Sequence, residues 1–180
     1  MKQADVPALA IAPMAVRRSL ATADSDCIVV AVSGGGGLSK QAAALDRYGE
    51  ITEAVASGDI SGEPGSTLLL RNLRGARAAR VLLAGFGSGP SIAEKDFIGA
   101  LRRIAGCLAA LGARRVLLAL PIRQVTGRGP DWAIRLIVQS VHDAWLGTAY
   151  VLAGGHGATG RPVSLLATFL INRARRASRL

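Results

Sequence analysis

The stretch CIVVAV, residues 27–32, is apolar at every position. A strand that is apolar on both of its faces is typical of a sheet buried on both sides. The strand is followed, after one serine, by four glycines: Gly34, Gly35, Gly36 and Gly37. A helix is then predicted over 39–47, with Ser39 as its N-cap. This order of strand, glycine loop and helix predicts an α/β fold.

Strands and helices continue to alternate along the chain. We predict further strands over 67–72, 80–84 and 114–120, and helices over 50–57, 91–111 and 131–144. The first two of these strands are separated by a short link, which favours a hairpin or neighbouring strands. The longest helix has apolar residues at helical spacing, and Ser91 and Glu94 have the spacing of a capping box. Gly112 stands where a C′ glycine ends a helix.

The two ends of the chain have less regular patterns. Residues 9–16 favour one edge strand, and residues 147–160 are rich in glycine, which favours an irregular segment. Pro162 is typical of a first helical turn, so a helix is predicted over 162–177. Arginines gather at the end of that helix, where its dipole favours cations.

The composition indicates a folded, basic chain. Half of the 180 residues are hydrophobic and 19% are charged, which excludes a disordered protein. The net charge of +10 favours polyanionic partners such as DNA, RNA or acidic protein surfaces, and a solvated arginine-rich surface is the alternative. Cys27 and Cys107 lie in apolar surroundings without zinc-site spacing, which favours a reducing compartment, the cytoplasm. No apolar run reaches the length of a membrane span, so we expect no membrane partner.

Several short motifs follow one another in a fixed order. They are DCIVVAV at 26–32, LSKQAAALD at 38–46, GEPGSTLLL at 62–70, RVLLAGFG at 80–87 and GRGPDWAIRLIVQSVHDAW at 127–145. Together they resemble the start of the leucyl aminopeptidase (cytosol aminopeptidase) family, over about residues 24–145. A later stretch, GTAYVLAGGHGATGRPVSLLATFLINR at 147–173, is similar to the end of the same family's catalytic domain.

This resemblance implies two parts. Residues 1–145 would be the family's N-terminal domain, and residues 146–180 a remnant of the C-terminus of the catalytic domain. The family's N-terminal domain is related in fold to macro domains. The resemblance therefore implies a macro-domain-like sandwich of a mixed sheet with flanking helices, plus a C-terminal helix. The middle of the catalytic domain would be missing through a natural or a constructed deletion.

The resemblance also implies a metal-dependent aminopeptidase. In the family two divalent metals, Zn or Mn, are held by a lysine, several aspartates and a glutamate, within a signature N-T-D-A-E-G-R that does not occur here. The acidic residues after Glu63 are Glu94, Asp96, Asp131 and Asp143. The first three lie at predicted helix starts, where the helix dipole accounts for them. We therefore assign no catalytic residue, metal ligand or cofactor to this chain, and we expect a shortened protein without peptidase activity.

The glycine loop is a candidate phosphate site. A strand, a glycine-rich loop and a helix N-terminus together form an anion site, because free N–H groups and the helix dipole point outward. Gly34, Gly35, Gly36 and Gly37 resemble the loop with which macro domains hold the phosphates of ADP-ribose. The alternative is a plain connection, since a single glycine-rich loop is a common pattern.

Arginines form a candidate nucleic-acid site. Some bacterial members of the resembled family bind DNA as hexamers, and arginine contacts to phosphates would give affinity without sequence specificity. The candidate residues are Arg71, Arg74, Arg77, Arg80, Arg173, Arg175 and Arg176. The wider basic set to which they belong also includes Arg102, Arg103, Arg114 and Arg115. The alternative is a soluble surface that contacts the missing domain.

Association is the role that we expect first. If the catalytic middle is missing, one apolar face of the predicted helix over 162–177 loses its cover. An uncovered apolar patch favours self-association, or docking to a full-length aminopeptidase paralogue.

Overall fold

The computed structural model describes residues 12–15, 20–144, 148–156 and 162–170, with side chains described over 20–141. The first half of the chain forms short helices and strands. They are β1 (Ala12–Ala15), the 3-10 helix η1 (Leu20–Thr22), β2 (Cys27–Ser33), β3 (Gly37–Leu38), α1 (Lys40–Leu45), α2 (Glu50–Ala56), β4 (Thr67–Arg71) and β5 (Arg80–Gly85). After them come α3 (Glu94–Leu111), β6 (Arg115–Ala119), α4 (Pro130–Ala144), β7 (Thr148–His156) and β8 (Pro162–Leu170).

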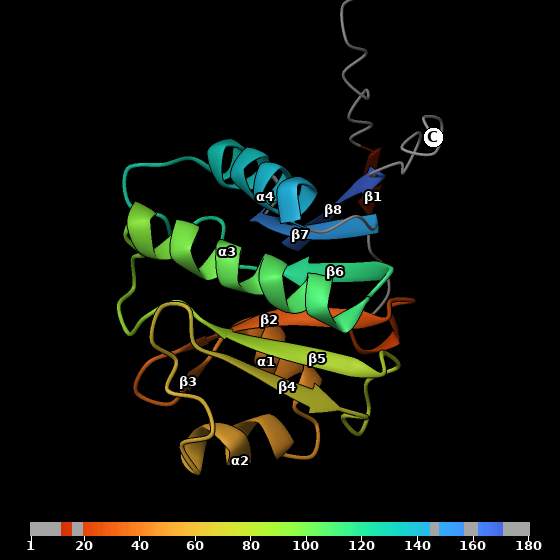
Figure 1. Ribbon diagram of the computed structural model, residues 1–180, viewed down its shortest axis with the longest axis vertical. Helices are drawn as coiled ribbons and strands as arrows, with labels where there is room; N and C mark the ends of the chain where they lie inside the picture. Colours follow the sequence, from red (N-terminus) through yellow and green to blue (C-terminus); the bar gives the residue numbers. More distant parts are fainter. Residues whose placement is uncertain (1–11, 16–19, 145–147, 157–161, 171–180) are drawn as a thin grey trace, which may run out of the picture.

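The strands form one mixed sheet in the order β1-β8-β7-β6-β2-β5-β4, with β3 paired to β2 (Figure 1). The strand β2 is parallel to both β5 and β6, and β6 is parallel to β7. At the edges the pairing is antiparallel, between β4 and β5, between β7 and β8, and between β1 and β8. The predicted α/β sandwich with a mixed sheet and flanking helices is confirmed, and so is the hairpin of β4 and β5.

Apolar side chains alternate between the two faces of the central strand. Cys27, Val29 and Ala31 of β2 pack on the side of α3 and α4. Ile28 and Val30 pack on the side of α1 and α2. Both clusters are buried, so the unbroken apolar run that opens the sequence analysis reflects a strand covered on both faces.

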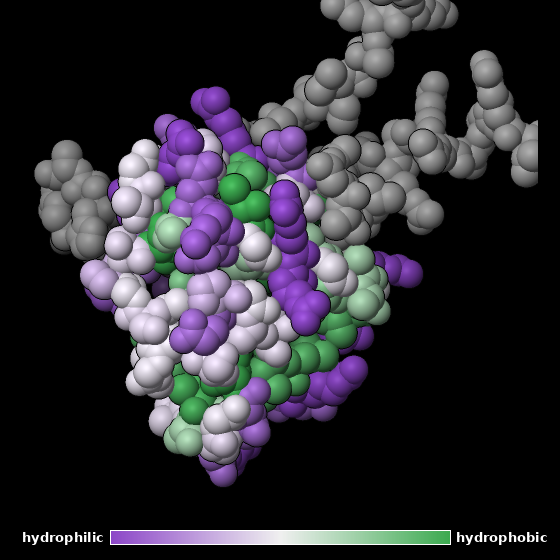
Figure 2. Space-filling model, turned by 60° about the vertical axis from the view of Figure 1, so that its left-hand side comes forward, coloured by the Kyte–Doolittle hydropathy of each residue, from purple (hydrophilic) through white to green (hydrophobic). Residues whose placement is uncertain are grey.

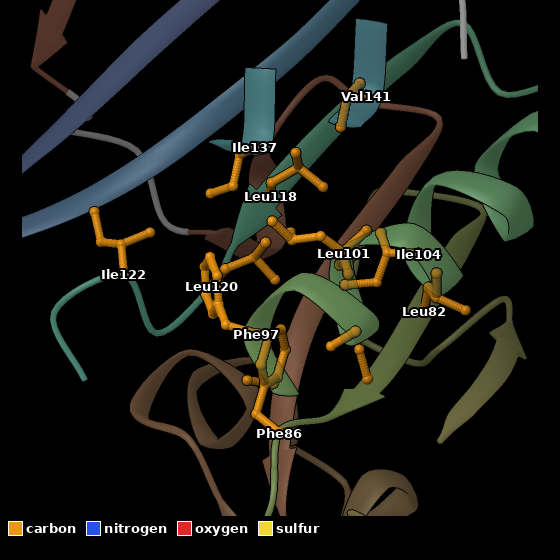
Figure 3. Close-up of a cluster of buried hydrophobic side chains, with 14 of the residues drawn as sticks. Leu82, Phe86, Phe97, Leu101, Ile104, Leu118, Leu120, Ile122, Ile137 and Val141 are labelled. Atoms are coloured by element: carbon orange, nitrogen blue, oxygen red, sulfur yellow. The ribbon is translucent and has the colours of Figure 1, made fainter. Parts of the chain in front are cut away.

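The larger cluster is centred on α3. Figure 3 shows Phe97, Leu101 and Ile104 of this helix beside side chains of the sheet and Ile137 of α4. The ring of Phe97 lies 5.7 Å from that of Phe86 and 6.2 Å from that of Trp132, centroid to centroid, in tilted pairs. Such aromatic pairs add to the hydrophobic stabilisation of the cluster.

The start of α3 differs from the prediction. Its N-cap is Ala93, and no side chain caps it, so the capping box of Ser91 and Glu94 is wrong. The cause lies in Ile92, whose N–H donates to Gln124 and whose carbonyl accepts from Thr126, a strand-like bridge to the loop after β6. The helix can begin only after this bridge. Its end agrees with the prediction, because Gly112 is a left-handed C-cap.

The C-terminal prediction needs a larger correction. Residues 148–156, expected to be irregular, form β7, and residues 162–170, expected to start a helix, form β8. The two strands pair with each other in an antiparallel hairpin, and β7 also pairs with β6. Pairing with the sheet overrides the helical pattern of a segment that is also rich in residues that fit a strand. Residues 171–177 of the predicted helix lie outside the described residues.

The proposed domain boundary falls inside the sheet. The strands β6 and β7 stand on either side of it and are hydrogen-bonded neighbours. The division into 1–145 and 146–180 stays a prediction. Within the described residues no helix is both long and apolar enough to cross a membrane.

One face of the molecule bears patches of hydrophobic residues. The face in Figure 2 shows hydrophobic residues between hydrophilic ones, most continuously across its lower part. Among the large hydrophobic side chains over 20–141, Tyr48 is exposed. Its ring lies under the guanidinium of Arg74, 5.0 Å from ring centroid to Cζ.

One carboxylate ties the starts of two central strands together. Asp26 precedes β2, and its Oδ2 accepts hydrogen bonds from the backbone N–H groups of Arg114 and Arg115, both at 2.9 Å. Burial raises the pKa of the Asp26 carboxyl, but these hydrogen bonds and the nearby charges of Arg115 and Arg80 together outweigh burial and hold the pKa below its ordinary value of 3.8. The charged form of Asp26 therefore stabilises the fold.

We expect Gly106→Ala and Gly62→Ala to change stability in opposite directions. Gly106 lies inside α3 with nothing within 4 Å of an added Cβ, so alanine should raise the free energy of unfolding by about 0.5–1 kcal/mol. Gly62 has φ +74°, and its Cβ would overlap the backbone of Ser33. Alanine there should lower the free energy of unfolding by at least about 2 kcal/mol. Urea unfolding of both variants measures the difference, and a loss of stability in Gly106→Ala would contradict the assigned length of α3.

We expect Asp26→Asn to destabilise the protein in a pH-dependent way. A carboxyl whose folded pKa is lowered contributes stability above its ordinary pKa and loses it as the pH falls through the folded value. At neutral pH the variant should lose about 1 kcal/mol, allowing for solvent screening of a partly exposed group. The difference from the parent should shrink as the pH falls below 3.8 and vanish once the pH is below the lowered folded pKa of Asp26. Urea unfolding across this range measures it, with Asp59→Asn at an exposed position as control. A gap that persists in acid would contradict the assigned role of Asp26.

Candidate functional site

A cavity of about 410 Å³ lies where the parallel strands β2, β5 and β6 end. We call it the carboxyl-end cavity. Its walls include the last residues of β2, the segment after β5 around Phe86, and the loop of residues 119–124 after β6. In α/β sheets, ligands bind outside the carboxyl ends of the parallel strands, so the position is typical of a binding site.

Polar and apolar groups line this cavity together. Phe86, Ile92 and Leu120 supply buried apolar walls. Lys40 and Arg123 supply positive charge. Such a mixture of apolar walls and a few polar groups suits a small ligand with an anionic part.

Two serines of the cavity already have hydrogen-bond partners. Ser39 caps α1 by accepting from the N–H of Ala42 at 3.1 Å, as predicted for this residue. Ser33 donates to the carbonyl of Gly37 at 3.3 Å. The hydroxyl groups therefore shape the loop, and Lys40 is an exposed cation at the wall of the cavity that could hold a ligand.

The predicted glycine loop borders the cavity. Gly34, Gly35 and Gly36 form the turn between β2 and β3, Gly37 is the first residue of β3, and the cavity is lined by the residues on either side of the four glycines, Ser33 and Leu38. Two of the glycines have a positive φ, Gly35 at +81° and Gly36 at +88°, which explains glycine at these positions. The N–H of Gly34 donates to the carbonyl of Gly87. The strand β3 and Ser39 lie between this turn and α1, and phosphate binding by the loop stays a prediction.

The predicted arginine set is divided between different surroundings. Arg74 is bound to Glu50, Nε to Oε1 at 2.7 Å, and this contact raises the pKa of Arg74 and lowers that of Glu50. Arg71 stands opposite Arg80 at the end of the β4–β5 hairpin. Arg173, Arg175 and Arg176 lie outside the described residues. DNA binding by this set stays a prediction.

Arg77 and Arg80 line a second cavity, of about 460 Å³, at the amino ends of the parallel strands. We call it the amino-end cavity. Its other walls come from the segment before β2 and from the start of β6, which brings in Arg114 and Arg115. These two arginines are far from Arg77 and Arg80 in sequence. The sequence did not predict that these four arginines converge. It would have done so only if β5 and β6 had been expected as the two parallel neighbours of β2, because the starts of such strands lie at one edge of the sheet.

Several carboxylates of the described residues make structural contacts. Asp46 accepts from the N–H groups of Ile51 and Thr52 at the start of α2. Glu94 is bound to Arg128 at 2.8 Å, and Asp24 to Arg115. Within the part of the chain whose side chains are described, no group of three or more His, Cys, Asp or Glu could hold a metal ion.

The buried thiol is unsuited to nucleophilic chemistry. Cys27 lies in the middle of the sheet with no exposed surface. Burial raises the pKa of its thiol to about 11. The thiolate is the reactive form of cysteine, so Cys27 stays protonated and inert at neutral pH.

Comparison with known proteins identifies the family. The profile of the cytosol aminopeptidase family, N-terminal domain, matches residues 29–145. A probable cytosol aminopeptidase of Methylobacillus flagellatus is 36% identical over 121 residues, which are 66% of this chain and 24% of that protein. One of Xanthomonas axonopodis pv. citri is 37% identical over 132 residues, 72% of this chain and 27% of that protein. The chain thus spans about a quarter of the length of the curated relatives that it matches.

Solved structures support the fold. The macrodomain of Mycobacterium tuberculosis DarG superimposes with a TM-score of 0.59 at 14% identity, covering 73% of this chain and 91% of that one. The macrodomain of Thermus aquaticus DarG does so with a TM-score of 0.57 at 17% identity, covering 76% and 93%. At these identities the likeness concerns the fold, and it confirms the macro-domain-like architecture. With the profile match over 29–145, the chain belongs to the cytosol aminopeptidase family and contains that family's N-terminal domain.

Proposed function

We propose that this chain serves the cytosol aminopeptidase family by association and that it does not itself cleave peptides. The observation that carries this proposal is the use of its carboxylates. Asp26 and Asp46 hold backbone N–H groups, while Glu50 and Glu94 hold arginines at separate places. A two-metal peptidase site needs several carboxylates that converge on one point. The contacts made by these four acids are structural and lie at separate places, which supports a domain that stabilises its fold with these charges and does not use them to bind metal.

The edge of the sheet supports association. The strand β4 ends the strand order, so one side of its backbone has no neighbouring strand among the described residues. Its residues Thr67, Leu68, Leu69 and Leu70 are half-buried. An open edge with apolar side chains is a template for another chain. The partner that we propose is a second copy of this chain or a full-length aminopeptidase of the family.

The expected compartment is the cytoplasm. Cys27 and Cys107 are free, and free thiols persist in a reducing compartment.

We expect the purified chain not to hydrolyse a chromogenic leucine amide, with or without added Mn²⁺ or Zn²⁺. Host aminopeptidase must first be removed, and a full-length family enzyme in the same assay is the positive control. Metal-dependent turnover that follows the chain through purification would contradict the proposal. In sedimentation velocity, alone and mixed with the full-length enzyme, the chain should move as part of a larger species. A well-folded monomer that ignores the intact enzyme would also contradict the proposal.

A second candidate function is the binding of a nucleotide such as ADP-ribose. The observation that favours it is the carboxyl-end cavity, with Lys40 and Arg123 at the ends of three parallel strands. Apolar walls would receive a base or ribose, and Lys40 would receive a phosphate. The glycines 34–37 border the same cavity and could contribute backbone N–H groups.

We expect Lys40→Ala to weaken ADP-ribose binding about tenfold, because a lysine–phosphate contact is charge-assisted. Lys95→Ala is the matched control, since Lys95 is exposed at the start of α3 and does not line the cavity. Isothermal titration calorimetry measures both. An absence of heat with the parent chain would remove this candidate, and an equal loss in both variants would attribute the binding to net charge alone.

A further inference from the structure

The amino-end cavity has more positive than negative charge. Four arginines line it, Arg77, Arg80, Arg114 and Arg115, together with the two acids Asp24 and Asp26. The residues come from three separate segments, which the sheet brings together because β2, β5 and β6 are parallel and start at the same edge.

Both acids are already bound. Asp24 is paired with Arg115 at 2.6 Å, and Asp26 accepts the N–H groups of Arg114 and Arg115. Their negative charge is therefore directed to the protein itself. An anion that enters the cavity meets acids that are partly neutralised.

Two of the four guanidinium groups are uncommitted. Arg115 is held by Asp24, and Arg80 donates from Nη1 to the carbonyl of Leu111 at 3.2 Å. The side chains of Arg77 and Arg114 are exposed and make no ion pair or hydrogen bond with the described residues. Two free guanidinium groups on one cavity are a suitable receptor for an anion with several oxygens.

An unpartnered hydroxyl lies in the same cavity. Ser25 lies between the two acids in sequence, and its Oγ is buried without a hydrogen-bond partner among the described residues. Buried polar atoms nearly always have a partner in folded proteins. Ser25 thus adds to the wall of the cavity a polar group whose hydrogen bonding the described residues leave incomplete.

We propose that the amino-end cavity binds the phosphate or pyrophosphate group of a small phosphorylated compound. Arginine guanidinium groups bind phosphate oxygens in pairs of parallel hydrogen bonds, which suits Arg77 and Arg114. A small ligand fits better than a nucleic acid, because the four arginines line one cavity of about 460 Å³ and not an extended surface. Arg74, which could extend the basic surface, is paired with Glu50.

This site lies at the opposite end of the strands from the carboxyl-end cavity. It goes beyond the proposed association and does not depend on it. The site can therefore fail its test while the association stands, and the reverse also holds.

The test is calorimetric titration of the full chain with pyrophosphate at low salt. The double variant Arg77→Ala/Arg114→Ala should bind about tenfold more weakly or not at all. The control Arg102→Ala/Arg103→Ala removes the same charge from the exposed side of α3, away from the cavity, and should bind as the parent does. Unchanged thermal unfolding of both double variants would show that the fold is intact.

A second arm separates the two sources of phosphate. Short duplex DNA is titrated into the parent chain with and without saturating pyrophosphate. We expect pyrophosphate to bind the parent chain in the absence of DNA. We also expect the loss of pyrophosphate affinity to be confined to the double variant Arg77→Ala/Arg114→Ala. The proposal is overturned if pyrophosphate gives no heat while DNA binds, or if the control variant loses affinity as much as the cavity variant.

Discussion

The whole structure depends on the burial of β2 on both of its faces. This strand has parallel neighbours on each side, and its side chains enter both hydrophobic clusters. A strand placed in this way needs helices on both sides of the sheet, since each apolar face must be covered. The pairs α3 with α4 and α1 with α2 meet this need. The parallel direction of β5 and β6 follows as well, because their connections include the covering helices.

The two cavities are a consequence of the same arrangement. Parallel strands bring all their starts to one edge and all their ends to the other, so residues distant in the sequence meet twice. At the ends of the strands the loops leave a space with Lys40 and Arg123 beside apolar walls. At the starts they gather arginines and two acids. The chemistry of each edge is set by loops that bear little of the packing, which is where proteins commonly place function.

The local patterns predicted the central part of the chain and failed at its C-terminal end. CIVVAV, the periodic residues of α3 and the cap Ser39 are signals carried by neighbouring residues, and these predictions are confirmed. The segment 162–170 has leucines that suit either a helix or a strand, and its pairing with β7 decides the outcome. The capping box failed for a similar reason, because the backbone of Ile92 makes hydrogen bonds to Gln124 and Thr126 in the loop after β6, which is distant in the sequence. For the candidate sites, the sequence placed Arg77, Arg80 and Arg114 in one basic set but did not indicate that they meet in one cavity, since only the sheet brings them together.

The depth of Cys27 has a practical consequence for the study of motion in this protein. Its side chain has no exposed surface, whereas Cys107 on α3 is partly exposed and lies 3.7 Å from the hydroxyl of Thr67, Sγ to Oγ1. A thiol-specific dye should therefore reach Cys107 from the native state and reach Cys27 only when the central strand opens. The labelling rates of the two thiols would thus report two different motions, the rate at Cys107 the local exposure of α3 and the rate at Cys27 the opening of the sheet.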